Sequence, residues 1–225
     1  MRICYVGAGN FSQGFIYPQL ARHGVELAAV CDLDIEKARR AAAMWGFRRV
    51  YTDFERMCAV EEPDAVFCVG RQQMQYQVGL RLLELGLPTY VQKPAAQTAA
   101  EVRDMAQVAA RSGALCHVGF NLRSAPSALR VKQIIASAEF GGPTLMLFRY
   151  GLMSNRIWHK AIADQHIHAI DFIIYMLGDW KSVSVAPLYD DTARGYVAAI
   201  KMACGVPAAL CGVSEQDPDF EFLYY

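Results

Sequence analysis

The chain has 225 residues, of which 54% are apolar, and its 22 basic side chains balance 22 acidic ones. This length allows one large domain or two small ones, with a real buried core. The apolar content argues against a disordered chain, and the zero net charge argues against a broad basic surface for nucleic acid.

The seven cysteines are an odd set without any Cys-x-x-Cys pair, and most lie in apolar, strand-like runs. This pattern indicates buried, reduced thiols in a cytosolic protein rather than a disulfide framework or a zinc site. No signal peptide precedes the first apolar run, and no apolar run is long enough to span a bilayer. We therefore expect a cytoplasmic protein that does not contact a membrane.

The first 32 residues predict a strand, a turn, a helix and a second strand, in that order. Apolar strands are expected at 3–6 and 25–30, and an amphipathic helix is expected from the glycine-rich turn at 7–14 to Leu20. An acidic residue, Asp32, closes the unit just after the second strand.

Each part of this unit has a separate task in binding a dinucleotide. Gly7 can adopt the tight turn, Gly9 lets the backbone approach a pyrophosphate, and the helix N-terminus offers unpaired N–H groups to the phosphates. Asp32 is placed to accept hydrogen bonds from the adenosine ribose. The residues expected to bind the cofactor are Gly7, Gly9, Asn10, Phe11, Ser12 and Asp32, with Gln92 and Lys93 further along the chain.

Two residues refine this interpretation. Ser12 occupies the third glycine position of the fingerprint, where a small residue still allows the helix to pack closely on the strand. The carboxylate of Asp32 would repel the 2′-phosphate of NADP and no arginine follows it at once, so NAD is the expected cofactor and NADP the less favoured one. The alternative is an ordinary strand–turn–helix unit without a ligand.

Strand and helix patterns continue to alternate as far as residue 119, which predicts a parallel sheet with right-handed crossovers. The expected strands are 49–51, 64–69, 89–91 and 115–119, and the expected helices are 35–45, a short one capped by Asp53, 74–85 and 98–111. We therefore predict the α/β fold class, with a doubly wound Rossmann domain over residues 1–120.

The pattern changes after residue 120. Helices are expected at 126–138 and 162–177, and strands at 144–150, 183–185, 195–202 and 206–213. This order predicts a smaller, shortened α+β domain over residues 121–225 with a mostly antiparallel sheet, as the substrate-binding domain.

Gln92-Lys93-Pro94 directly follows the strand that ends at Val91. Ligands of a doubly wound sheet lie beyond the carboxyl ends of its strands, so Lys93 is expected at the nicotinamide end of the cofactor. Pro94 restricts the backbone of Lys93, for instance through a cis bond, and a lysine whose pKa is lowered there can exchange a proton with a hydroxyl. The alternative is a surface lysine before a turn proline.

Asp164, His168 and Asp171 are spaced four and three residues apart within an expected helix, which puts all three on one face. Asp164 can orient His168, and His168 is a natural general base for an alcohol proton. The alternative is that Asp164 only caps the helix and His168 is a satisfied core histidine. His166 lies on a different face and is expected to be structural, so a metal site built from both histidines is not expected.

Asn121-Leu122-Arg123 follows the last expected strand of the first domain. Arg123 and Tyr150 are expected to contact a polar substrate. Four further candidates are each better explained as surface or packing residues: Arg149, Arg156, Trp158 and His159.

Together these residues resemble the glucose–fructose oxidoreductase and inositol dehydrogenase family (Gfo/Idh/MocA) along almost the whole chain. The shared marks are Gly7-Ala8-Gly9, Val30-Cys31-Asp32, Pro63-Asp64-Ala65-Val66, Gln92-Lys93-Pro94, Gly119-Phe120-Asn121-Leu122-Arg123 and Asp164-x-x-x-His168-x-x-Asp171. The resemblance implies an NAD(P)-dependent dehydrogenase or reductase that transfers hydride between nicotinamide and a hydroxyl-bearing carbon of a sugar, nucleotide-sugar or cyclitol. It also implies that Lys93 and His168 handle the proton, while Asp164 helps to hold the substrate hydroxyl.

The chain departs from the family pattern at three places. Gln92 stands where the family usually has Glu, and the missing negative charge should lower the pKa of Lys93. Gln75 stands where the family often has His. Family members also usually continue further, whereas this chain ends on a strand-like run at 222–225, as either a natural short form or a truncated one. An incomplete sheet would expose an edge, so we expect a homo-oligomer that forms through the second sheet.

Two other functions stay open beside the oxidoreductase acting on a small polyol. One is a non-catalytic dinucleotide-binding sensor or regulatory protein, and the other is an imine or thiazoline reductase, which would not need an alcohol base. The presence of Lys93, Asp164 and His168 opposes the sensor, because a decayed site has no reason to keep all three.

Overall fold

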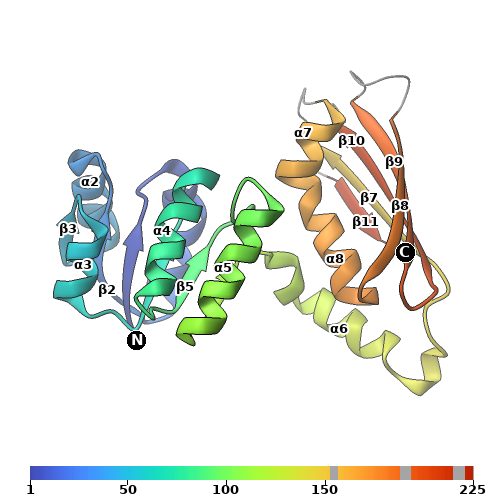
Figure 1. Ribbon diagram of the computed structural model, residues 1–225, viewed down its shortest axis with the longest axis horizontal. Helices are drawn as coiled ribbons and strands as arrows, with labels where there is room; N and C mark the ends of the chain where they lie inside the picture. Colours follow the sequence, from blue (N-terminus) through green and yellow to red (C-terminus); the bar gives the residue numbers. More distant parts are fainter. Residues whose placement is uncertain (153–156, 188–193, 215–220, 225) are drawn as a thin grey trace. The chain divides into compact units, whose positions relative to one another are not determined.

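The computed structural model describes residues 1–152, 157–187, 194–214 and 221–224. The chain divides into two compact units, Met1–Gly119 and Phe120–Tyr225 (Figure 1). Each unit has a sheet and a core of its own.

A six-stranded parallel sheet forms the centre of the first unit, with the strand order β3-β2-β1-β4-β5-β6. Its strands are β1 (Arg2–Val6), β2 (Glu26–Cys31), β3 (Arg49–Tyr51), β4 (Ala65–Cys68), β5 (Thr89–Val91) and β6 (Cys116–Val118). The chain therefore builds outward from β1 in one direction and then from β4 in the other. This confirms the predicted doubly wound order, which has its switch point between β1 and β4.

Helical segments connect each strand of this sheet to the next. They are a π-helical turn η1 (Ser12–Ile16), α1 (Tyr17–Arg22), α2 (Ile35–Trp45), α3 (Phe54–Glu61), α4 (Gln72–Glu84) and α5 (Ala99–Ser112). Asp34, Asp53 and Thr98 cap the starts of α2, α3 and α5 by accepting hydrogen bonds from first-turn N–H groups. The helix starts predicted at Asp53 and Thr98 are thus confirmed.

The first unit has one apolar layer on each face of its sheet. Successive strand residues point to opposite faces, so Cys4 and Val6 of β1 belong to one buried cluster while Tyr5 belongs to the other. Tyr5 packs edge-on against Tyr17, with ring centroids 4.6 Å apart, which fixes the start of α1 against β1. Burial on both faces explains why the strands read as continuous apolar runs.

A five-stranded sheet forms the second unit, with the order β11-β7-β10-β9-β8. Its strands are β7 (Met146–Leu152), β8 (Trp180–Pro187), β9 (Gly195–Met202), β10 (Pro207–Ser214) and β11 (Glu221–Tyr224). Among the strands described, β7 and β10 are the one parallel pair, so the predicted mostly antiparallel sheet is confirmed. The sequence pattern does not predict the parallel pairing of β7 with β10. The connection between two strands, and not their local sequence, decides whether they pair in parallel.

The helical segments of the second unit are η2 (Asn121–Ser124), α6 (Pro126–Ile135), η3 (Ala138–Phe140), α7 (Trp158–Ala161), the π-helical turn η4 (Ile162–His166) and α8 (Ile167–Leu177). Helix α8 lies along one face of the sheet (Figure 1). Its Phe172 is buried edge-on against Phe148. The single helix predicted over 162–177 therefore begins with a π-helical turn, in which each turn contains more residues than in an α-helix.

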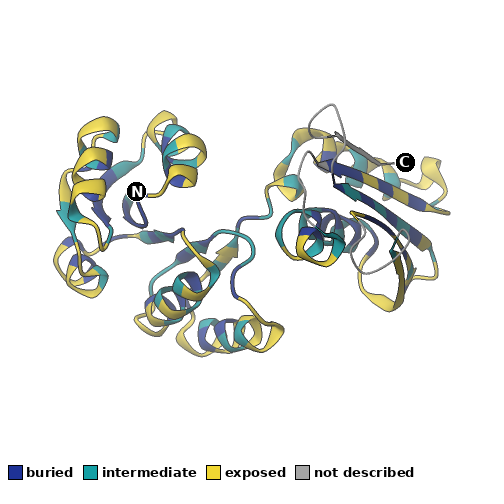
Figure 2. Ribbon diagram, turned by 90° about the horizontal axis from the view of Figure 1, so that it is seen from above, coloured by how far each residue is buried: buried dark blue, intermediate teal, exposed yellow. Residues whose placement is uncertain are grey.

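Buried residues alternate with more accessible ones along β10 and along β9 from Tyr196 onward, as Figure 2 shows for the second unit. The buried set packs under α8, and the alternate residues leave apolar side chains such as Leu147 and Val197 exposed on the opposite face. None of the helices in the described part of the chain is both long and apolar enough to cross a membrane.

Candidate functional site

The glycine turn after β1 requires its first glycine for the fold itself. Gly7 has a φ of +106°, and a Cβ atom at this position would lie 2.0 Å from the carbonyl oxygen of Val69. The Gly7 carbonyl also accepts a hydrogen bond of 3.0 Å from the Tyr17 hydroxyl. Only glycine can therefore let β1 pass this close to the end of β4.

Gly9 differs from Gly7 because nothing in the first unit requires glycine there. A Cβ atom at Gly9 would have no atom within 4 Å among the described residues, and its φ lies outside the left-handed region. Gly9, Asn10 and Phe11 are all exposed at the start of the first helical segment. The open space above Gly9 is what close approach of a pyrophosphate to the backbone would need.

Asp32 lies directly against this turn, at the end of β2. Its Oδ2 atom accepts a 2.8 Å hydrogen bond from the Ala8 N–H, and its Oδ1 atom accepts a 3.0 Å bond from the Asp34 N–H. Each carboxylate oxygen can accept a further hydrogen bond, so the group can hold the turn and still bind a ribose hydroxyl.

The Ser12 side chain has a structural role in the first unit. Its side chain is 1% exposed, and its Oγ atom lies 3.1 Å from the Tyr5 hydroxyl, which donates the hydrogen bond. Ser12 thus allows the close helix–strand packing expected of the third fingerprint position. Any contribution to a cofactor would come from its backbone and not from its hydroxyl.

The Gln92–Pro94 loop follows β5 at the carboxyl edge of the sheet, and the peptide bond between Lys93 and Pro94 is cis. The Gln92 side chain points back into the loop, where its Oε1 atom accepts hydrogen bonds from the Lys93 N–H (3.0 Å) and the Tyr90 hydroxyl (3.2 Å). A Cβ atom at Gly119 would lie 2.1 Å from that same oxygen, so this glycine is needed for the loop to pack. Lys93 itself is half-buried.

Asp171 and Arg123 of the second unit bind each other. The Arg123 Nε and Nη2 atoms donate to the two carboxylate oxygens of Asp171 at 2.8 and 2.5 Å. This pair raises the pKa of Arg123, and the guanidinium also lies over the rings of Phe120 and Tyr175. The two-point bond anchors η2 to α8, and the contact expected between Arg123 and a substrate stays a prediction.

Asp164 lies in η4 and His168 in α8, which follows η4 directly, and both residues are half-buried. The His168 ring meets Phe120 edge-on, with centroids 6.1 Å apart, and its Nδ1 atom is shielded from solvent. The negative charge of Asp164 acts on Tyr150, where burial and then this charge raise the pKa of the phenol to about 12.

Tyr150 lies in the core of the second unit rather than at a surface. It is 2% exposed and its ring packs 5.1 Å from that of His166. The contact expected between Tyr150 and a substrate stays a prediction. His166 is fully buried, and its Nδ1 atom lies 3.0 Å from the Tyr196 hydroxyl, which agrees with the structural role expected for it.

Burial of His166 should make the second unit sensitive to acid. Burial lowers its pKa from 6.5 to about 4, so between these values the proton binds the unfolded chain and not the folded one. We expect the free energy of unfolding to fall as the pH falls through this window, by about 1.4 kcal/mol per pH unit for one proton. Urea unfolding of the wild type and of His166→Gln at several pH values tests this, and equal pH slopes for both would contradict it.

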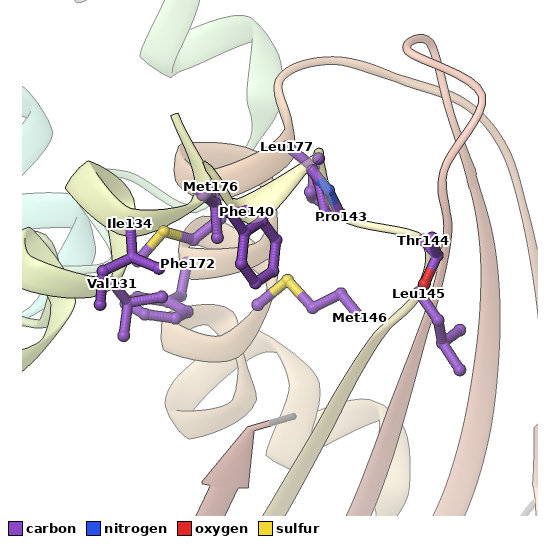
Figure 3. Close-up of a pocket in the computed structure, with 12 residues that line it drawn as sticks. Val131, Ile134, Phe140, Pro143, Thr144, Leu145, Met146, Phe172, Met176 and Leu177 are labelled. Atoms are coloured by element: carbon purple, nitrogen blue, oxygen red, sulfur yellow. The ribbon is translucent and has the colours of Figure 1, made fainter. Parts of the chain in front are cut away.

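Two apolar cavities of the second unit contain none of the expected site residues. One of about 360 Å³ lies between α6, α8 and the start of β7, where Ile134, Phe140 and Met176 point into it (Figure 3). Another of about 270 Å³ is lined by Trp180, Val183 and neighbouring apolar residues. Neither has a titratable side chain suited to proton transfer. The described residues also contain no group of three or more His, Cys, Asp or Glu that could hold a metal ion.

The remaining sequence candidates are exposed, packed against other aromatic rings, or outside the described residues. Arg149 and His159 are exposed, and Trp158 packs against His159 and Tyr196. Arg156 lies outside the described residues. The sequence did not reveal that the hydroxyls of Tyr5, Tyr17 and Tyr90 hold the two loops, because a tyrosine in an apolar segment gives no sign of the hydrogen-bond partner of its hydroxyl.

Comparison with known proteins identifies what this chain is similar to. The family profile described as "Oxidoreductase family, NAD-binding Rossmann fold" (GFO_IDH_MocA) matches residues 1–120. D-glucoside 3-dehydrogenase from Escherichia coli is 25% identical over 190 residues, which cover 79% of this chain and 54% of that protein. Inositol 2-dehydrogenase from Klebsiella pneumoniae is 27% identical over 192 residues, which cover 82% of this chain and 57% of that protein. A dehydrogenase structure from Chromobacterium violaceum has a TM-score of 0.90 at 25% identity, covering 100% of this chain and 68% of that one.

The chain spans little more than half the length of these two relatives. The family profile nevertheless matches more than half of the chain, over the unit that carries the glycine turn, Asp32 and Lys93. The chain therefore belongs to the Gfo/Idh/MocA family of oxidoreductases, with the family's NAD-binding Rossmann fold in its first unit.

Proposed function

We propose that the protein is an NAD-dependent oxidoreductase that moves hydride between nicotinamide and a hydroxyl-bearing carbon of a sugar, nucleotide-sugar or cyclitol. The observation that carries the proposal is the contrast between Gly7 and Gly9: the fold requires the first, and only a ligand would require the second. The relatives named as glucoside and inositol dehydrogenases support the same substrate class.

The first unit offers what a dinucleotide needs. The backbone of Gly9, Asn10 and Phe11 would face the pyrophosphate, and the Asp32 carboxylate would accept hydrogen bonds from the ribose. Ser12 would contribute its backbone alone, and the Gln92–Lys93 peptide would border the nicotinamide end. When bound, NAD supplies the acceptor or donor of the hydride.

Proton transfer is assigned to Lys93 and His168, with Asp164 in support. The Nδ1 atom of His168 is shielded from solvent, so Nε2 is the ring atom that would take or give the substrate proton. The Lys93 ammonium would hold the substrate oxygen through a charge-assisted hydrogen bond and share the proton with it. Asp164 would accept a hydrogen bond from a substrate hydroxyl, while Arg123 and Tyr150 would support the helix that carries these groups.

A binding and turnover experiment tests this function. NADH should bind with quenching or enhancement of its fluorescence, and a panel of sugars, nucleotide-sugars and cyclitols with NAD should give absorbance at the reduced-nicotinamide band. Binding of NADH without turnover on any hydroxyl substrate would favour the sensor. Turnover on cyclic imines alone would favour the imine reductase.

Asp32 should decide the choice between NAD and NADP. Asp32→Asn keeps an oxygen for the Ala8 N–H and removes the charge that would repel the 2′-phosphate. We expect the Kd for NADPH to fall about tenfold in this variant. The Kd for NADH should rise about tenfold, because the one remaining oxygen accepts from the Ala8 N–H and the ribose loses a charged acceptor. Fluorescence titration measures both constants, and a wild type that binds NADPH more tightly than NADH would overturn the role given to Asp32.

The compartment and the assembly complete the proposal. The seven cysteines carry no disulfide, which suits the reducing cytoplasm. On the sheet face opposite α8, Leu147 and Val197 are exposed among small side chains such as Ala199 and Ala209, so a second copy could cover this face and form a homo-oligomer. A monomer in sedimentation at micromolar concentration would contradict the oligomer.

A further inference from the structure

Gln75, in the first turn of α4, is a buried amide whose hydrogen bonds converge on the loop that carries Lys93. The side chain is 1% exposed. Its Nε2 atom donates to the carbonyl oxygens of Gln92 (3.0 Å) and Pro94 (2.9 Å), and its Oε1 atom accepts from the Gln92 N–H (2.9 Å). One side chain therefore binds the backbone on both sides of Lys93.

The chemistry of this contact selects an amide. The loop presents two carbonyl oxygens and one N–H to the same buried point, so the partner must donate twice and accept once. Among side chains of this length, only glutamine does both without a charge. An ionised carboxylate would face two carbonyl oxygens, and an apolar side chain would leave three buried polar groups without partners.

A second set of contacts holds the loop through the Gln92 side chain. Tyr90, stacked between Phe67 and His117 with ring centroids 4.7 and 5.7 Å away, donates its hydroxyl to the Gln92 side chain. That side chain in turn accepts the Lys93 N–H. The backbone of the loop is therefore fixed from α4 and from β5, and Lys93 is the residue that this arrangement presents.

We propose that Gln75 is a positioning residue for Lys93: it fixes the direction of the lysine side chain by holding the peptide groups before and after it. The action of Lys93 on a substrate rests on the proposed function. The clamp, by which we mean the three hydrogen bonds from the Gln75 side chain to the loop, lies within the first unit alone. Gln75 touches neither cofactor nor substrate and acts through the loop.

The test compares the chemical reactivity of Lys93 in Gln75→Met and in the wild type. Methionine matches the length of glutamine and keeps the packing while removing all three hydrogen bonds. Brief acylation with an N-hydroxysuccinimide ester, quantified by peptide mass spectrometry against Lys37 as internal reference, should show Lys93 about threefold or more faster in the variant, because the released loop exposes it. Gln77→Met, on the exposed face of the same helix, is the matched control and should leave Lys93 unchanged.

Turnover provides a second readout that a merely structural role would not give. In Gln75→Met, kcat should fall about tenfold while the Kd for NADH stays within about twofold, because only the orientation of the proton-handling group is lost. If the wild type shows no turnover, the proposed function fails, and the acylation result still decides on the clamp. Equal Lys93 reactivity in the folded variant and the wild type would overturn the proposal.

If Gln75→Met does not fold, hydrogen exchange of the wild type tests the proposal. The Gln92 amide proton should then be strongly protected from hydrogen exchange, because it is bonded to the buried Gln75 oxygen. Exchange of that proton at the rate of an unstructured peptide would overturn the proposal, and strong protection would support it.

Discussion

His168→Ala is expected to lower turnover about a hundredfold or more while the Kd for NADH stays within about twofold. The imidazole is the only group of the second unit to which we assign the substrate proton, and it lies in a different unit from the glycine turn and Asp32. Its loss should therefore affect the chemical step and leave cofactor binding intact. Steady-state kinetics with the substrate found in the panel and fluorescence titration with NADH measure the two effects.

A second histidine in the same unit provides the control for this prediction. His159 is exposed on α7, so His159→Ala removes an imidazole of equal size without a proposed role. It should retain the kcat of the wild type. Full activity of His168→Ala would remove His168 from the mechanism, and equal losses in both variants would indicate damage to the unit rather than to proton transfer.

Alanine at Gly7 and at Gly9 is expected to separate stability from cofactor binding. At Gly7 the new Cβ atom meets the Val69 carbonyl at 2.0 Å and the backbone has a φ of +106°. We expect a loss of about 3 kcal/mol or more in the free energy of unfolding. At Gly9 nothing lies within 4 Å of the new atom, so stability should change by about 0.5 kcal/mol or less while the Kd for NADH rises about tenfold or more.

Urea unfolding and NADH titration of the same two variants check this pair. The decisive result is Gly9→Ala, which should be as stable as the wild type and yet bind the cofactor poorly. A Gly9→Ala protein with unchanged NADH affinity would show that the open space is not the pyrophosphate position. A stable Gly7→Ala protein would contradict the close approach of the turn to β4.

The predictions made from local signals agree best with the structure. Asp53 and Thr98 were expected to open helices because their side chains accept N–H groups only two or three residues away. The acid after the second strand was expected beside the glycine turn because parallel neighbours align their carboxyl ends. Such signals involve either adjacent residues or a single strand pairing, so a pattern in the chain is sufficient to reveal them.

The sequence predicts fewer of the polar contacts in the second unit, because the partners in these contacts are far apart along the chain. Arg123 and Asp171 are 48 residues apart in sequence, and no periodic pattern in the sequence predicts the two hydrogen bonds between them. Tyr150 lies in the core of the second unit, because alternation along β7 places it on the buried face of the sheet. The sequence also does not predict the π-helical turn before His168, since the apolar pattern of this turn matches that of an α-helix.

The sequence by itself determined the class of this protein: the doubly wound first unit, the dinucleotide turn with its acid, and the helix that carries Asp164 and His168. Only the tertiary structure decided which of its polar residues are already engaged, that Gly9 but not Gly7 is unconstrained by the fold, and that Gln75 holds the Lys93 loop from 17 residues away. The physical reason is that helices, strands and turns follow from short-range backbone preferences, whereas hydrogen-bond partners at long separation are chosen by packing.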